Sequence, residues 1–213
     1  MATPASKLST RAALLDAGHQ IVVADGFAAL TVRKVAAAAG ANLGSFVYHF
    51  GTRDEFVREL IERWYAPMLS GMTLVVDGAA RPIEGLKRAI LQLIDFMLQQ
   101  DVFLARLLMA AAAGDAPARK FLGSIAKRHP RLLLRLVRRA QADGTLVRDH
   151  PLQVLMFVMA SVSLPRLLST AWQGPPLFGK PLSAALSRMA RDRNRIVQRL
   201  DWALRGLNPE ATR

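Results

Sequence analysis

The chain has 213 residues, enough for one or two domains, and 52% of them are hydrophobic while 21% are charged. This balance argues against a disordered chain, and the lack of cysteine excludes disulfides and thiolate metal sites. The formal net charge of +13 is weak support for nucleic-acid binding, because residues 1–54 hold five basic and three acidic residues, a net charge of only +2.

The chain carries no segment that predicts a membrane span or a secretory signal. Its longest apolar run, residues 154–164, stops at Pro165 and is shorter than the roughly 20 residues that cross a bilayer. Charged residues interrupt the N-terminal stretch. We therefore expect a cytoplasmic protein that has no membrane partner.

Helical periodicity predicts three short elements at the N-terminus. Apolar residues recur at helical spacing through residues 8–25. Thr31 is the expected N-cap of a second helix, which Gly40 ends, and Asn42 is the expected N-cap of a third helix over residues 43–50. The third helix is predicted to turn four apolar side chains inward: Leu43, Phe46, Val47 and Phe50.

Six longer helices are predicted in the rest of the chain, and no segment alternates with the two-residue period of a strand. Proline and glycine mark most of the breaks, and Pro67 and Pro130 are expected to bend the helices that contain them. The fold class is therefore all-α with about nine helices. The six segments are about 53–77, 82–100, 101–114, 115–143, 149–172 and 182–207.

The second and third helices, joined by the short link 40–42, have the pattern of a helix-turn-helix. In such a unit the second helix enters the major groove of DNA, where small residues permit close approach and polar or aromatic side chains contact base edges. Residues at the helix ends are placed to contact phosphates. The expected DNA-binding residues are Thr31, Arg33, Gly44, Ser45, Tyr48, His49 and Arg53.

The first quarter of the chain resembles the tetracycline-repressor (TetR) family of bacterial transcription regulators over roughly residues 10–56. Ala41 and Val47 depart from the family pattern, which usually has Val and often Tyr at these positions. The residues that carry the resemblance are Gly26, Phe27, Thr31, Val32, Val35, Ala36, Ala39, Gly40, Asn42, Gly44, Tyr48, His49, Phe50 and Arg53.

The resemblance implies a helix-turn-helix DNA-binding domain over residues 1–54 and an effector-binding and dimerisation domain over residues 55–213. It also implies a homodimer formed through the last two long helices, with double-stranded operator DNA and a small-molecule effector as partners. We favour the apolar stretch 152–168 as part of this interface over the alternative that it is internal core. A second candidate series has the same two explanations: Ile196, Leu200, Ala203, Leu204 and Leu207.

A ligand pocket is a further expectation, set against the alternative that the same aromatic and Met side chains are plain core. The candidates are Phe96, Phe103, Met109, Phe121, Met156 and Phe157. A basic stripe could bind an anionic effector, but we favour a solvated surface for it. It consists of Lys127, Arg131, Arg135 and Arg138.

The predicted function is a ligand-responsive, sequence-specific transcription regulator, typically a repressor that a small molecule releases from its operator. The main alternative is a nonspecific or architectural DNA-binding protein that uses the basic charge. A helical enzyme or interaction module is the third possibility. No catalytic constellation, metal-ligand spacing or cofactor motif stands out, so we expect no enzyme, no metal and no cofactor.

Overall fold

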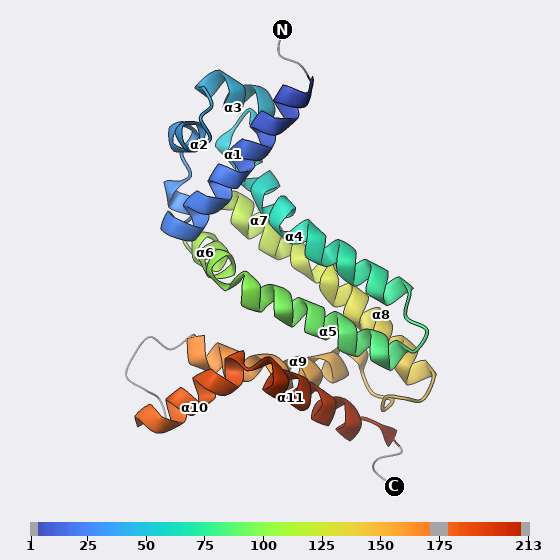
Figure 1. Cartoon of the computed structure of the whole chain (residues 1–213). Coiled ribbons are helices and arrows are strands. Elements are labelled where there is room, and N and C mark those ends of the chain that lie inside the picture. The colour runs from blue at the N-terminus through green and yellow to red at the C-terminus, as the bar shows by residue number, and fades with distance from the viewer. Residues whose placement is uncertain (1–3, 171–178, 210–213) are drawn as a thin grey trace. The chain divides into compact units, whose positions relative to one another are not determined.

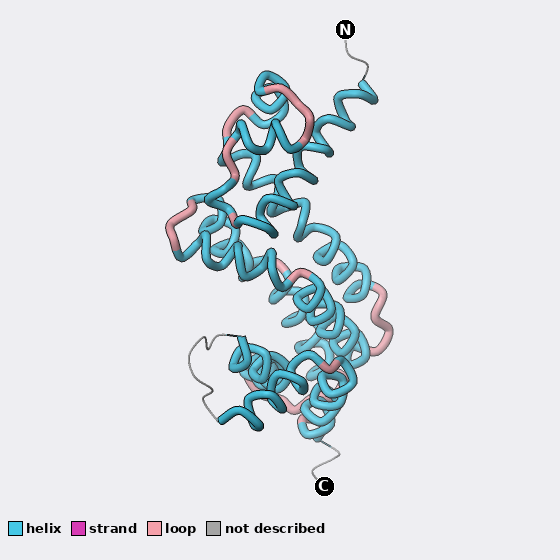
Figure 2. Tube along the Cα trace, turned by 60° about the vertical axis from the view of Figure 1, so that its left-hand side comes forward, coloured by secondary structure: helices cyan, strands magenta, loops and turns pink. Residues whose placement is uncertain are grey.

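The structure, a computed structural model, describes residues 4–170 and 179–209. Within those ranges it is helical, without strands, and the helices are joined by short loops (Figures 1 and 2). The all-α prediction is confirmed. The helices are α1 (Pro4–Asp25), α2 (Val32–Ala38), α3 (Leu43–Phe50), α4 (Arg53–Asp77), α5 (Pro82–Gln99), α6 (Asp101–Ala112), α7 (Ala116–Ser124), α8 (His129–Ala142), α9 (Pro151–Thr170), α10 (Gly179–Arg191) and α11 (Arg193–Gly206), with 3-10 turns η1 (Phe27–Ala29) and η2 (Ile125–Lys127).

Two predicted long helices are each divided in the structure. The segment predicted as one helix over 115–143 forms α7, the turn η2 and α8, and Pro130 lies in the first turn of α8, where its missing N–H is tolerated. The segment predicted over 182–207 is divided at Asp192, whose carboxylate accepts hydrogen bonds from the backbone N–H groups of Asn194 and Arg195 and so caps α11. These two divisions account for the difference from nine helices.

The chain forms two compact units. Unit 1 comprises residues 1–70 and 99–128, and unit 2 comprises residues 71–98 and 129–213. Helix α4 contributes to both, because the division falls within it. The domain boundary predicted at residue 54 stays a prediction.

Unit 1 is built around aromatic side chains. The buried ring of Phe103 on α6 stacks on His19 of α1 at a centroid distance of 5.1 Å and on Trp64 of α4 at 4.7 Å, and it meets Phe27 of η1 edge-on at 5.6 Å. Such pairs stabilise a core beyond the area that they bury. The N-terminal helices are therefore packed against α6 in one hydrophobic core.

Helices α5, α8, α9, α10 and α11, with the last turns of α4, form unit 2. The buried amide of Gln141 donates from Nε2 to the carbonyl oxygens of Val147 and Asp149, which ties the α8–α9 loop to α8. Ion pairs join Lys87 to Asp201 and Arg193 to Asp95, at 2.6 and 2.9 Å.

The apolar series predicted as a dimer-interface candidate on the last helix is largely internal to unit 2. Four of its members have exposures of 8% or less, so they form core and are unavailable to a second chain. For these four positions the interface explanation is wrong, and the core explanation holds: Ile196, Leu200, Ala203 and Leu204.

Candidate nucleic-acid interface

Helix α3 is anchored to unit 1 by two of its eight residues. Phe46 and Phe50 are buried, and their rings lie 5.1 and 4.9 Å from the ring of Phe56 on α4. Arg11 of α1 places its guanidinium 5.6 Å from the ring of Phe50 while it pairs with Glu59 on α4 at 2.6 Å. The four-residue spacing of the two phenylalanines therefore fixes which side of α3 faces inward.

The stripe of α3 next to the buried one is exposed and contains two apolar residues that were predicted to face inward. Leu43 is 45% exposed and Val47 is 55% exposed, so this part of the prediction is wrong. The physical reason is geometric, because a helix of eight residues whose inward stripe is Phe46 and Phe50 turns the neighbouring stripe at 43 and 47 away from the core. With Gly44 and Tyr48 these residues form what we call the reading face: Leu43, Gly44, Val47 and Tyr48.

Tyr48 is the largest side chain on the reading face, and it is 67% exposed. Its ring meets that of His49 edge-on at a centroid distance of 5.1 Å. Ser45 and His49 are half-buried and lie beside the reading face, while Gly44 is exposed. Four residues expected to contact DNA therefore lie on or beside the exposed side of α3: Gly44, Ser45, Tyr48 and His49.

The N-terminal ends of the two short helices are closed by side-chain caps. The Thr31 hydroxyl oxygen accepts from the backbone N–H of Lys34 at 3.2 Å, and Asn42 Oδ1 accepts from that of Ser45 at 2.8 Å. Gly40 and Gly51, before and after α3, have φ values of 63° and 68°, which side chains with a Cβ rarely adopt. The caps and glycines set the length and direction of α3.

The basic residues near α2 and α3 differ in their surroundings. Arg33 is exposed, and within the described ranges the structure gives it no ion-pair partner. Lys34 pairs with Asp25 at 2.7 Å, and this hydrogen bond lowers the pKa of the Asp25 carboxyl. Arg53 is half-buried and donates to four acceptors within unit 1.

Residues 14–60 match the family model of bacterial regulatory proteins of the tetR family. This segment of the chain belongs to the TetR family. Members of this family are transcription regulators, so the predictions of the family and of a DNA-binding regulator are both confirmed.

Two curated relatives carry the same description, the HTH-type transcriptional repressor KstR2. The protein of Mycolicibacterium smegmatis is 25% identical over 185 residues, which cover 85% of this chain and 86% of the relative. The protein of Mycobacterium tuberculosis is 33% identical over 79 residues, 37% of this chain and 40% of the relative.

Solved structures of other regulators share the TetR fold. The ketosteroid transcriptional regulator KstR2 of Mycobacterium tuberculosis aligns with a TM-score of 0.61 at 22% identity and covers 93% of this chain and 94% of its own. The complex of SmeT with triclosan aligns with a TM-score of 0.69 at 18% identity, covering 95% and 93%. At these identities the likeness establishes the fold.

The six side chains predicted to line an effector pocket fall into three environments. Phe103 and Phe121 are buried in the aromatic core of unit 1, where Phe121 also lies under the guanidinium of Arg128 at 5.2 Å. Met109, Met156 and Phe157 are more than half exposed, and Phe96 is half-buried. Their role in ligand binding stays a prediction.

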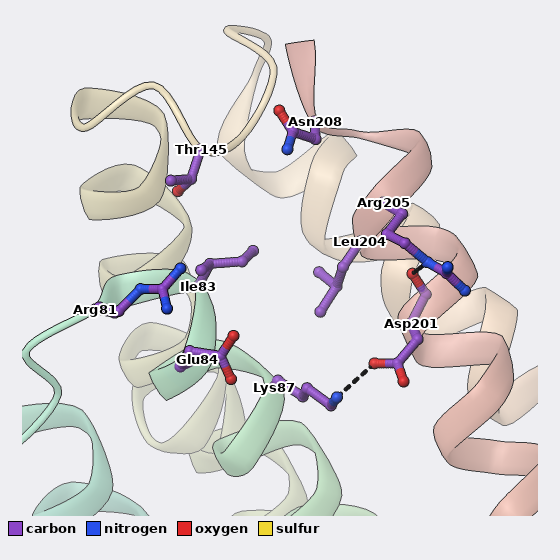
Figure 3. A pocket seen from close by; sticks show the side chains of 9 residues that line it. All are labelled: Arg81, Ile83, Glu84, Lys87, Thr145, Asp201, Leu204, Arg205 and Asn208. Carbon is purple, nitrogen blue, oxygen red and sulfur yellow. Dashed lines mark hydrogen bonds and ion pairs between the residues drawn. The ribbon is translucent and has the colours of Figure 1, made fainter. Parts of the chain in front are cut away.

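A cavity of about 430 Å³ lies in unit 2 and is drawn in Figure 3. Its walls come from the start of α5, the α8–α9 loop and the end of α11, and the six predicted pocket residues are absent from them. The Lys87–Asp201 pair crosses one side of it (Figure 3). Charged groups of both signs line this space. The lining residues are Arg81, Ile83, Glu84, Lys87, Thr145, Asp201, Leu204, Arg205 and Asn208.

Two further expectations concern metals and membranes. Over residues 4–170 and 179–209, no cluster of three or more His, Asp or Glu side chains could hold a metal ion. Among these same residues, no helix has the length and apolar character needed to cross a bilayer.

Proposed function

We propose that this TetR-family chain reads operator DNA through the reading face of α3. The supporting observation is that Phe46 and Phe50 hold α3 in unit 1 while Tyr48 stands exposed on its opposite side. Leu43 and Val47, both exposed, are added to the predicted DNA-binding residues, because apolar side chains in a major groove contact thymine methyl groups. Tyr48 supplies a ring for the same kind of contact and a hydroxyl for a base edge.

We assign phosphate contacts to the residues that flank α3. Thr31 uses its hydroxyl oxygen as an acceptor for Lys34, which leaves the hydroxyl proton for donation to a phosphate. Arg33 is exposed and suited to the same role. His49, near the end of α3, has the same role, and Arg53 offers Nη1, whose bond to Asp54 is its longest at 3.3 Å. Ser45, beside the reading face, is placed to contact a base edge.

We also propose a homodimer that uses the exposed side of α9. Leu152, Met156, Ala160 and Leu164 recur every four residues on α9 and are all exposed, as is the adjacent Phe157. A row of this kind is typical of a surface that a second copy covers. A dimer would place two copies of α3 on a two-fold symmetric operator.

The regulatory part of the proposal is repression relieved by a small molecule. The two relatives described as transcriptional repressors and the SmeT complex with triclosan support it. The effector would bind within residues 55–213, in the cytoplasm, and would lower operator affinity by favouring a different conformation.

The test of DNA reading is Tyr48→Ala, with Leu74→Ala as a matched control because Leu74 is 75% exposed and belongs to unit 2, whereas α3 belongs to unit 1. A duplex enriched from random DNA by the wild-type protein serves as the probe. We expect Tyr48→Ala to weaken binding by about ten- to a hundredfold, which corresponds to the loss of a base contact, and the control to bind normally. Equal affinity of the two variants in a fluorescence anisotropy titration would contradict the proposal.

A further inference from the structure

Arg53, the first residue of α4, joins three separate parts of unit 1. Its Nε donates to the carbonyl oxygen of Leu30 at 3.0 Å, and its Nη2 donates to that of Phe27 at 3.0 Å. Nη2 also donates to Asp115 Oδ2 at 2.9 Å. The two carbonyl groups belong to the η1 turn and to its C-cap residue, which lead into α2. This side chain therefore holds the turn before the helix-turn-helix by two hydrogen bonds.

Asp115 is the shielded anionic partner of Arg53 and is far from it in the sequence, whereas the second partner, Asp54, is its exposed neighbour at 3.3 Å. Its side chain is 12% exposed, and besides pairing with Arg53 it accepts from the backbone N–H of Ala118 at 3.1 Å and caps α7. One carboxylate therefore fixes the start of α7 and the guanidinium of Arg53 together. A charge-assisted bond in such a shielded position is stronger and more directional than an exposed ion pair.

The η1 carbonyls and the carboxylate all contact one side of a single guanidinium. Only Arg presents enough donors in a rigid fork to reach all of these acceptors at once, since the ammonium of Lys is a compact point charge. Without the Asp115 carboxylate, the guanidinium keeps its two carbonyl acceptors and the longer, exposed contact of Nη1 with Asp54, but Nη2 loses its shielded charged partner. The entry to α2, and with it the orientation of α3, would then be less well defined.

We infer that Asp115 is a positioning residue for DNA reading, which acts through Arg53 and the η1 turn. The inference rests on the proposed role of α3 and adds a residue of the α6–α7 region that the resemblance does not point to. Asp115 itself contacts no DNA. It keeps the turn before α2 in the conformation from which α2 and α3 present the reading face.

The discriminating variant is Asp115→Asn, because Asn is as good an N-cap as Asp and should preserve the start of α7 while removing the charge that holds Arg53. Glu62→Gln is the matched control in the same unit. Glu62 holds Arg128 through two hydrogen bonds of 2.6 and 2.7 Å, so this variant also removes a carboxylate from an arginine pair, but away from η1.

Hydrogen exchange gives a readout that does not depend on DNA. The amides of Ala29, Leu30 and Thr31 are hydrogen-bonded within the turn, to the carbonyl oxygens of Gly26, Phe27 and Ala29. We expect Asp115→Asn to speed their exchange at least about fivefold, because local opening becomes easier when the turn loses its clamp. Glu62→Gln should leave these amides at the wild-type rate.

The second readout is the ratio of affinities for the enriched duplex and for a random duplex. Asp115→Asn should lower binding to the enriched duplex about tenfold and leave binding to the random duplex within about twofold, since a misoriented α3 loses base contacts before phosphate contacts. Unchanged exchange at the turn, or equal losses on both duplexes at unchanged thermal stability, would overturn the inference. A wild-type protein that enriches no duplex would count against the proposed function instead, and the exchange rates would still decide the role of Asp115.

Discussion

His129, at the start of α8, shows how burial alone alters the chemistry of one residue. Desolvation lowers the pKa of its imidazole from 6.5 to about 4, so the ring is neutral in the folded chain at physiological pH. In the unfolded chain the same ring gains a proton near pH 6.5. The unfolded state therefore binds more protons between these two values, and stability must fall as the pH drops through this window.

We expect the free energy of unfolding to decrease by about 1–2 kcal/mol more in the wild type than in His129→Gln when the pH is lowered from about 7 to about 5. Urea titrations at both pH values measure the difference. His150→Gln is the matched control, because His150 is exposed. A wild-type decrease no larger than that of His129→Gln would show that burial of this imidazole does not affect the acid sensitivity.

At the scale of single residues, the sequence was most informative about helix caps and least informative about which side of a helix faces the core. Thr31 and Asn42 were predicted as N-caps and both are, because their side chains accept from backbone N–H groups three positions away. Leu43 and Val47 were placed on the wrong side of α3, because hydrophobicity does not reveal which of two adjacent stripes finds a partner. The partner, Phe56, lies on another helix.

Arg53 illustrates a second limit of the same kind. Its position next to α3 predicts a phosphate contact, but no local pattern indicates that Phe27, Leu30 and Asp115 converge on it. Asp115 is separated from it by 62 residues, and that contact arises from packing of the whole unit.

At the scale of helices, the packing of α1 against α4 depends on the absence of one side chain. A Cβ at Gly18 would lie 2.5 Å from Cζ of Phe56 and 2.9 Å from its Cε1, closer than carbon atoms approach. Since Phe56 is fully buried and also contacts both anchors of α3, it has little room to move. Gly18 therefore sets the separation of the two helices.

We expect Gly18→Ala to destabilise the protein by about 1–3 kcal/mol, although Ala favours a helix over Gly by about 1 kcal/mol. Gly123→Ala is the informative comparison, because a Cβ at this position in α7 meets nothing within 4 Å. It should be neutral or slightly stabilising. Chemical denaturation of both variants measures the two effects, and a stabilised Gly18→Ala would mean that α1 and α4 are not closely packed there.

The helices themselves were largely predictable, because glycine, proline and capping residues mark most of their ends. The two errors share a cause. Asp192 and the η2 turn interrupt apolar patterns that remain periodic on either side, so periodicity alone predicts one helix where the chain forms two.

At the scale of the whole molecule, the proposed dimer requires that the exposed apolar side of α9 is covered by the second copy. Phe157 is 55% exposed beside the row of apolar residues on this helix. We expect Phe157→Asp to raise the dimer dissociation constant by about thirtyfold or more, since a charge would be buried without a partner. Sedimentation velocity over a range of concentrations measures this change.

The control for the dimer is Leu74→Asp, which places the same charge at an exposed apolar position on α4. Its dimer dissociation constant should equal that of the wild type. If the Phe157→Asp protein dimerises as strongly as the Leu74→Asp protein, α9 is not part of the interface. The apolar stretch that contains the α9 row was visible in the sequence, whereas the sequence did not decide whether Ile196 and Leu200 belong to the core or to the interface.

In α3, different residues pack against the core and face the solvent, and this separation has an evolutionary consequence. The residues that hold this helix and the residues that it displays do not overlap, and Gly40 and Gly51 delimit it on both sides. Exchanges at Leu43, Val47 or Tyr48 should therefore cost little folding energy. A duplicated gene could acquire a new target by drift at these few codons while its product continued to fold.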